Sequence, residues 1–246
     1  MKFVGITGGV GAGKTEILNF LSSQDGIEVM LADEIAHDLM EPGTVCNQRL
    51  QELFAADSVF WSQGLTVAGM DEAGRGPLVG NVVAACVVMP RDGLIEWVDD
   101  SKKLSESRRE KVYEEIMRRA LYVGVGQATP AEIDEMNILQ ATKKAMREAA
   151  AQVSADVFLV DAVEHLGLAG TEVPIIKGDA TSYAIAAASI VAKVTRDRQL
   201  IALDRLYPDY GFARNKGYGT AEHIAALKRL GPCPEHRRSF IGHFWP

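Results

Sequence analysis

Three apolar segments of the sequence each end in an acid, and this pattern restricts the fold and the chemistry more than any other feature. LTVAGMDE ends in Asp71 and Glu72, DVFLVD ends in Asp161, and VPIIKGD ends in Asp179. Short runs of apolar and β-branched residues are typical of buried β-strands. A charge at the end of such a strand is costly unless it is paired or binds a cation. If the strands are neighbours, four carboxylates meet in one place.

The two adjacent acids set a geometric condition. Neighbouring side chains of a flat strand point to opposite faces, so Asp71 and Glu72 serve one site only where the chain bends. Gly74 and Gly76, on either side of Arg75, permit such a bend. An isolated Asp-Glu pair is usually solvated surface, but the AGRGPL sequence that follows favours a functional role.

Further elements surround these strands, and together they predict an α/β fold. Ser105 is a candidate N-cap, and Thr129 with Glu132 forms a candidate capping box around Pro130. An Ala- and Ser-rich helix near the end has side chains small enough for close packing on a sheet. Two additional strands are predicted over residues 81–90 and 121–128. Helices are predicted over residues 105–120 and 182–207, and a third helix begins at Pro130.

The first part of the chain follows a different pattern. Residues 2–7 read as a strand, GGVGAGKT as a turn, and the sequence up to residue 44 as a β-α-β-α run. Gly8, Gly13, Lys14 and Thr15 fit the phosphate-binding loop, in which backbone N–H groups, a lysine and a hydroxyl surround phosphates and Mg²⁺. A complete fold of that class needs about five strands, and this run supplies two. We expect a truncated fragment over 1–55 and a catalytic domain over 56–246, joined between residues 45 and 62.

Composition and charge limit the partners and the cellular location that we expect for the protein. The formal net charge is −7, but 11 basic and six acidic residues lie from Lys177 onward, so the C-terminal part can face phosphates. The three cysteines, Cys46, Cys86 and Cys233, are too far apart for a zinc cluster or disulfide framework. With no apolar run of about 20 residues and no secretory signal, we expect a cytoplasmic protein without membrane contact, acting as a monomer.

Four clustered carboxylates would repel one another. Two charges about 4 Å apart interact by about 4 kcal/mol at an effective dielectric of ~20. Divalent cations relieve this repulsion, and oxygen-only ligands favour Mg²⁺ or Mn²⁺ over zinc. Two such ions can activate water and stabilise the leaving oxygen in phosphodiester cleavage. The pattern therefore indicates a two-metal hydrolase.

Several long motifs resemble bacterial ribonuclease HII. They are MDEAGRGPLVGNVVAACVVMP, DSKKLSESRRE, VDAV, KGDATSYAIAAASIVAKVTRDR and YPDYGFARNKGYGTAEH. The resemblance implies a ribonuclease H-like five-stranded mixed sheet flanked by helices. It also implies cleavage of the RNA strand of RNA–DNA hybrids, and cutting at single ribonucleotides in duplex DNA to leave 3′-hydroxyl and 5′-phosphate ends. Asp71, Glu72, Asp161 and Asp179 would be the catalytic, metal-binding acids.

The same resemblance implies how ribose is distinguished from deoxyribose. Main-chain groups of Gly74, Arg75 and Gly76 would contact the 2′-hydroxyl, and Tyr218, in KGYGT, would stack on the following deoxyribose. A plain tight turn and a core tyrosine are the alternatives. Five lysines are candidate phosphate contacts or ordinary surface residues: Lys102, Lys177, Lys193, Lys216 and, in the same motif as Lys102, Lys103.

Some polar residues receive a structural interpretation. Asp197 lies four residues after Lys193 on the long predicted helix, so an ion pair is expected, with contact to the metals as the alternative. His165 and His236 are expected in surface or packing roles, since the histidines do not show metal-site spacing.

The opening, GITGGVGAGKT and LADEIAHDLMEPGT, resembles dephospho-coenzyme A kinase over about 45 residues. That resemblance implies Asp33 near an acceptor hydroxyl, but the family's lid and remaining strands are missing, so ATP is not expected as a cofactor. Two alternative functions stay open. One is an ATP-dependent phosphotransferase that uses Lys14, in which Asp161 would complete the metal site; the other is a nucleic-acid-binding module without catalysis.

Overall fold

A computed structural model describes residues 45–91, 94–98, 101 and 104–245. The predicted N-terminal strands and the loop with Gly8, Gly13, Lys14 and Thr15 lie outside the described residues, as does Lys102. The chain divides into compact units Met1–Gln48 and Arg49–Pro246. Helix α3, Val45–Trp61, runs without a break through the expected boundary between residues 55 and 56, and its Leu53 is fully buried.

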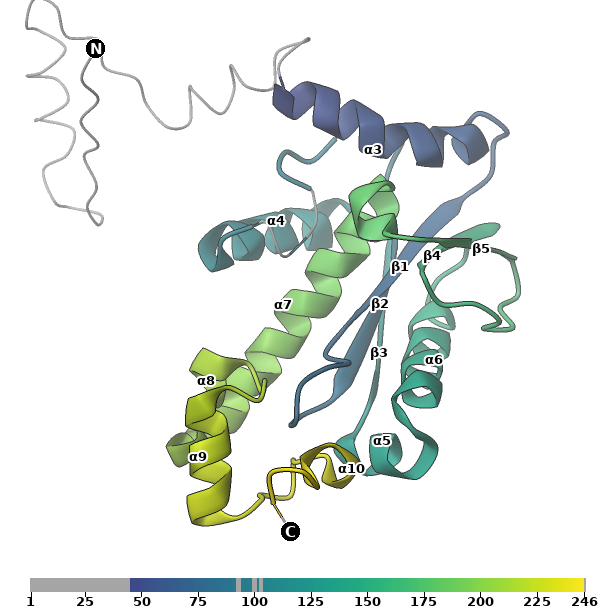
Figure 1. Ribbon diagram of the computed structural model, residues 1–246. Helices are drawn as coiled ribbons and strands as arrows, with labels where there is room; N and C mark the ends of the chain where they lie inside the picture. Colours follow the sequence, from purple (N-terminus) through teal and green to yellow (C-terminus); the bar gives the residue numbers. More distant parts are fainter. Residues whose placement is uncertain (1–44, 92–93, 99–100, 102–103, 246) are drawn as a thin grey trace, which may run out of the picture. The chain divides into compact units, whose positions relative to one another are not determined.

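Five strands form one mixed sheet in the order β3-β2-β1-β4-β5 (Figure 1), which confirms the predicted α/β architecture. The central strand β1 pairs antiparallel with β2 and parallel with β4. The outer pairs are antiparallel β2–β3 and parallel β4–β5. The bounds are Val67–Ala73 (β1), Val82–Val88 (β2), Tyr122–Ala128 (β3), Val157–Asp161 (β4) and Thr171–Ile175 (β5).

Two strands end at positions that differ from the predictions. β1 does not stop at its acids but continues to Ala73, because it stays paired with β2 up to the Ala73–Val83 position. β5 ends at Ile175, before Asp179, since Lys177 has a left-handed backbone (φ 57°) and starts the 3₁₀ turn η1, Gly178–Ala180. Asp179 is therefore presented by a turn between β5 and the next helix.

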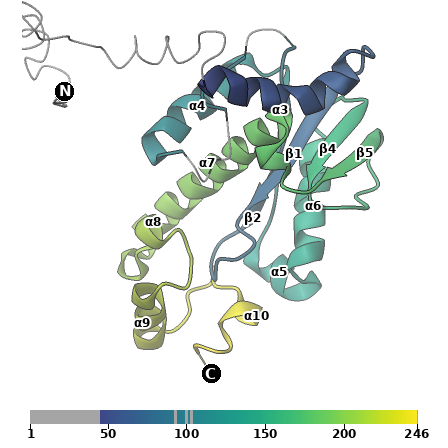
Figure 2. The same ribbon diagram turned by 45° about the horizontal axis from the view of Figure 1, so that its top comes forward.

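Helices cover both faces of the sheet (Figures 1 and 2). Helix α7, Tyr183–Leu206, packs on β1 and β2, with α4, Glu106–Arg119, beside it. Helix α6, Ile138–Ala150, covers β2 and β3 from the other side and follows the short α5, Pro130–Met136. The separate helix α6 is not anticipated from the sequence. As predicted, Ser105 is the N-cap of α4, and Thr129 with Glu132 forms a capping box at the start of α5.

Glycines in the strands let the helices approach the sheet closely. A Cβ atom at Gly69 of β1 would lie 2.0 Å from the carbonyl carbon of Ala184, in the first turn of α7. Gly126 of β3 has the same relation to α6, where a Cβ would lie 2.1 Å from the oxygen of Ala145. The small residues expected to permit close packing therefore lie on both the strand and the helix side.

The segment directly after α7 packs against that helix. It forms η2, Pro208–Tyr210, then α8, Phe212–Asn215, α9, Ala221–Leu230, and α10, Arg238–Ile241. Tyr210 and Phe212 are stacked, and with Val79 and Leu200 they belong to a small apolar cluster. This segment lies against the turn that follows β1, because Leu78 N–H donates to the Gly217 carbonyl.

Candidate active site

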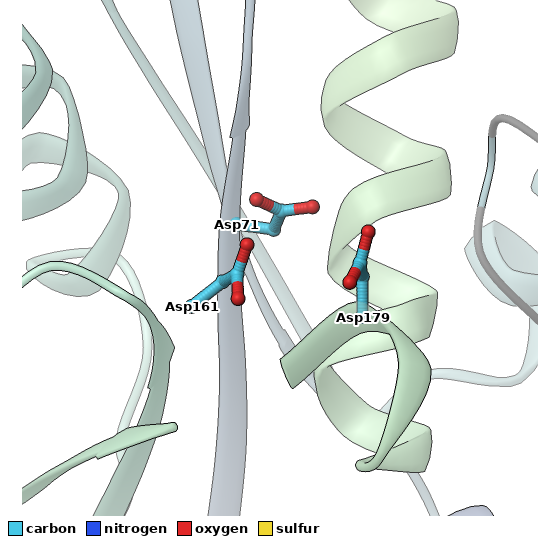
Figure 3. Close-up of side chains that lie close together, drawn as sticks. All are labelled: Asp71, Asp161 and Asp179. Atoms are coloured by element: carbon cyan, nitrogen blue, oxygen red, sulfur yellow. The ribbon is translucent and has the colours of Figure 1, made fainter. Parts of the chain in front are cut away.

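Three of the predicted acids converge between the sheet and α7. Asp71, Asp161 and Asp179 each offer a carboxylate oxygen, and these three oxygens lie within 4.8 Å of one another. Figure 3 shows the three side chains directed toward a common point from β1, β4 and η1. Residues from distant parts of the chain thus form one acidic cluster, which we call the aspartate cluster.

Strand register brings the first two together. β1 and β4 are parallel neighbours with Met70 opposite Val160, so Asp71 and Asp161 occupy equivalent next positions. Met70 and Val160 belong to the core packed against α6. Because side chains alternate along a strand, Asp71 and Asp161 face α7. The Gly178 N–H donates to Asp161 Oδ1 over 2.7 Å, which ties the turn carrying Asp179 to the end of β4.

Glu72 is adjacent to the cluster but is not one of the three converging acids. β1 stays extended through it, and alternation directs its side chain to the face opposite that of Asp71. Its N–H donates to Asp71 Oδ1 over 2.7 Å, and its Oε1 pairs with Arg75 Nη1 at 3.3 Å. β1 ends only after Ala73, and the chain bends at Arg75 and Gly76 rather than at the two acids.

Burial gives the cluster its electrostatic character. Asp71 is 5% exposed, and its pKa is raised well above the usual range by burial, by the charge of Glu72 and by that of Asp161. A hydrogen bond from Ser189 opposes this rise. The charged form of Asp71 is therefore unfavourable without a compensating cation, and the donor set consists of carboxylate oxygens alone. Such a site suits a hard divalent ion.

The glycine-flanked turn and Tyr218 lie next to each other. A Cβ at Gly76 would lie 3.7 Å from Cε1 of Tyr218. Arg75 and Gly76 are exposed, and Tyr218 is 49% exposed, so the core role for this tyrosine is excluded. Gly74 has φ 97°, a backbone conformation that favours glycine. An exposed aromatic ring thus stands beside a turn whose conformation requires glycine.

The remaining candidates separate into surface and structural residues. Lys177 is exposed, two residues before Asp179. Lys193 pairs with Asp197 at 2.7 Å, as expected, and Asp197 also lies 3.8 Å from Arg109. Lys216 Nζ lies 3.2 Å from Glu106. Of the two histidines given structural roles, His165 is exposed and His236 is buried.

Several buried polar residues near the site were not anticipated from the sequence. Arg196 and Arg237 are 1% and 0% exposed, and both donate to main-chain carbonyls of the turn after β1. Asp57 of α3, also fully buried, accepts from the Ser182 hydroxyl and the Ala184 N–H at the start of α7. Their partners lie more than 100 residues away in the chain, so local patterns give no signal for them.

Comparison with known proteins agrees with this geometry. Residues 68–244 match the profile of the family described as Ribonuclease HII. The chain belongs to the ribonuclease HII family. It is accordingly a metal-dependent endoribonuclease that acts on RNA–DNA hybrids. Residues 2–67 match the Dephospho-CoA kinase profile, which confirms the resemblance of the opening sequence and extends it beyond the expected 45 residues or so.

Similar proteins include two curated ribonucleases HII. That of Ruminiclostridium cellulolyticum is 54% identical over 200 residues, covering 80% of this chain and 78% of the relative. That of Desulfitobacterium hafniense strain Y51 is 46% identical over 238 residues, 92% of each chain. The second alignment therefore includes most of the segment before β1.

Solved structures show the same fold. Ribonuclease H2 from Pyrococcus horikoshii is 30% identical, with a TM-score of 0.62 over 71% of this chain and 93% of that one. The Mn²⁺ complex of Bst-RNase HIII, 17% identical with a TM-score of 0.55 over 89% of this chain and 72% of that one, shares the fold. Among the described helices, none is both long and apolar enough to span a bilayer.

Proposed function

We propose that the chain cuts at single ribonucleotides in duplex DNA as well as in RNA–DNA hybrids, using two divalent ions, Mg²⁺ or Mn²⁺, and leaving 3′-hydroxyl and 5′-phosphate ends. The observation that carries this proposal is the convergence of Asp71, Asp161 and Asp179 within 4.8 Å beside an exposed glycine-flanked turn. Family membership supports metal-dependent cleavage of hybrids. The finer substrate and the ion number are our inference.

In this proposal the three aspartates hold the ions together with Glu72, the residue that follows Asp71 in β1. When bound, such ions supply charge stabilisation for phosphodiester hydrolysis and lower the pKa of a bound water. The protein's own contribution is preorganisation. Parallel register fixes Asp71 against Asp161, and the Gly178–Asp161 hydrogen bond fixes the turn that carries Asp179. Burial of Asp71 and Asp179 limits competition from water.

Recognition of the ribonucleotide is assigned to the turn and to Tyr218. Main-chain groups of Gly74, Arg75 and Gly76 contact the 2′-hydroxyl, and the exposed Tyr218 ring stacks on the next sugar. Support comes from the position of the Tyr218 ring, whose Cε1 would lie 3.7 Å from a Cβ atom at Gly76. Lys177, exposed next to η1, is proposed to contact phosphate.

The proposal also covers the cellular location, the oligomeric state and the domain organisation. We propose a cytoplasmic monomer whose catalytic part is residues 56–246 preceded by a P-loop fragment that takes no part in cleavage. Because α3 crosses residue 55 and buries Leu53 and Asp57, the start of the catalytic part is best tested on forms that retain the whole helix.

The decisive assay uses a DNA duplex that contains one ribonucleotide, incubated with Mg²⁺ or Mn²⁺. We expect a cut immediately 5′ to the ribonucleotide. Asp71→Asn should reduce the rate by about 100-fold or more, the scale of losing one group that stabilises transition-state charge. Asp209→Asn, at an exposed acid far from the cluster in sequence, is the matched control and should retain the rate. A folded wild-type protein that leaves this duplex intact would refute the proposal.

A further inference from the structure

Arg237 is a buried cation whose hydrogen-bond acceptors are all main-chain oxygens, and its guanidinium also lies over the Phe240 ring, 5.2 Å from the centroid. Its side chain is 0% exposed, and it belongs to none of the ion pairs among the described residues. Its guanidinium donates from all three nitrogens to four carbonyl groups. These are Gly80 O from Nε (2.9 Å) and Nη2 (2.7 Å), Arg75 O (3.1 Å) and Pro77 O (2.9 Å) from Nη1, and Gly74 O from Nη2 (2.6 Å).

This arrangement uses the full donor capacity of arginine. A guanidinium has five N–H groups in one rigid plane, and the five hydrogen bonds of Arg237 account for all of them. Burial, followed by the nearby charge of Arg196, lowers the pKa of Arg237 to about 9. Burying a cation beside another cation is costly, so a residue that only fills space at this position would not need to be arginine.

The carbonyl directions fix the N–H groups of the same turn. In a trans peptide the C=O and the following N–H point in opposite directions, and the described chain has no cis peptide. The Gly74 and Arg75 carbonyls point at Arg237, so the N–H groups of Arg75 and Gly76 point away from it. Both of these residues are exposed, and within the described part of the chain neither N–H donates a hydrogen bond. Two aligned donors therefore face outward from the turn.

A second buried guanidinium fixes the far end of the turn. Arg196 of α7 donates to the carbonyls of Val79 and Asn81, each over 3.1 Å, and to Lys216 over 3.0 Å. Lys216 lies two residues before Tyr218, so this arginine joins the turn to the segment that carries the tyrosine. Among the described residues, only Arg237 donates hydrogen bonds to the Gly74 and Arg75 carbonyls.

We infer that Arg237 is a positioning residue for ribonucleotide discrimination. It holds the peptide planes after Gly74 and Arg75 so that two main-chain N–H donors stand ready for the ribose 2′-oxygen. This inference rests on the proposed function, in which the turn reads the sugar. A rigid donor pair loses no entropy when the 2′-oxygen arrives, whereas a mobile turn must first be ordered. The effect is therefore expected on recognition of ribose rather than on cleavage chemistry.

The test compares Arg237→Lys with Arg238→Lys at the exposed neighbouring position. Lysine keeps the charge but lacks the planar five-donor fork. Two constants are measured in Mg²⁺: KM for a duplex with one ribonucleotide, and the inhibition constant of the same duplex made entirely of DNA. For Arg237→Lys we expect KM to rise about 10-fold, the scale of one net hydrogen bond or more, while the inhibition constant changes less than about twofold. Arg238→Lys should change neither.

Each alternative result decides the question. An equal rise in both constants, or no rise in either, would overturn the inference. Arg237→Gln, which retains two donors without a buried charge, repeats the test if the lysine variant is unfolded at the assay temperature. Unfolding of both variants would also overturn it, since Arg237 would then stabilise the whole domain. Failure of the wild type to cut the ribonucleotide duplex refutes the proposed function instead, so the two failures are distinguishable.

Discussion

Lowering the pH should destabilise the fold through two buried histidines beside the Tyr218 segment. The Cys233 N–H donates to Nδ1 of His236 over 3.0 Å, so that nitrogen is an acceptor. At the other end, Nδ1 of His223 lies 2.8 Å from the Tyr218 carbonyl and must donate. The two Nε2 atoms are 3.1 Å apart and share one proton, which His236 supplies. The hydrogen-bonded chain is complete only when both rings are neutral.

The magnitude follows from the shifted pKa. Burial, followed by the neighbouring His223, lowers the pKa of His236 from 6.5 to about 4. Between these values the unfolded chain binds more protons than the folded one, so stability is fully present above pH 6.5 and is lost as the pH falls toward 4. A shift of this size corresponds to a loss of about 2 kcal/mol between pH 7 and pH 5, and about 3 kcal/mol in total. The pKa of His223 is also lowered by burial, which adds to the same trend.

Urea unfolding at pH 7, 6 and 5 measures this effect. The free energy of unfolding of the wild type should fall by about 2 kcal/mol more over this range than that of His236→Gln, which has no ring to titrate. His165→Gln, at an exposed histidine, should follow the wild type. Equal losses of stability in the wild type and His236→Gln, or titration of His236 near pH 6.5 in the folded protein, would refute this prediction.

Three further predictions concern other parts of the chain. Gly69→Ala should lower the free energy of unfolding in urea by about 3 kcal/mol or more, because its Cβ would lie 2.0 Å from the Ala184 main chain. Gly242→Ala is the control and should be tolerated, since the space around Gly242 is open. Equal stability of the two variants would contradict the close packing of β1 on α7. Asp57→Ala should lower the free energy of unfolding by about 2–4 kcal/mol, since it leaves two buried donors at the start of α7 without their acceptor. An unchanged unfolding midpoint would argue against a stabilising role for these two hydrogen bonds. Lys14→Ala should leave ribonucleotide cleavage unchanged within about twofold; a large loss would instead favour the phosphotransferase hypothesis.

The acids were predictable because each belongs to a local pattern. An apolar run that ends in an aspartate is visible in the sequence at Asp71 and Asp161, and the parallel pairing of their strands brings the two side chains together. Asp179 converges as expected although a turn, not a strand, presents it, since the left-handed Lys177 ends β5 early. Glu72 differs from these acids, because the pairing of β1 with β2 continues through it and the bends of the chain come later, at Arg75 and Gly76.

Residues whose partners are distant in the chain could not be found this way. Arg237 contacts carbonyls that lie about 160 positions earlier, and nothing in the HRRSF sequence distinguishes it from its exposed neighbour Arg238. The same holds for Asp57, whose helix appears in the sequence as part of the joining segment. Main-chain acceptors leave no mark in the sequence, so such contacts become visible only when the fold is known.

The continuity of β1 with the glycine-flanked turn has a consequence for where the cut falls. Gly74 lies three positions after Asp71, directly after the end of β1, and the pairing of β1 with β2 keeps this span of about 10 Å extended. In the proposed function, the turn that recognises the ribose and the acids that bind the metal ions are therefore held at a fixed distance from each other. Duplexes of any base sequence should be cut at the same offset from the ribonucleotide, with no neighbouring secondary products.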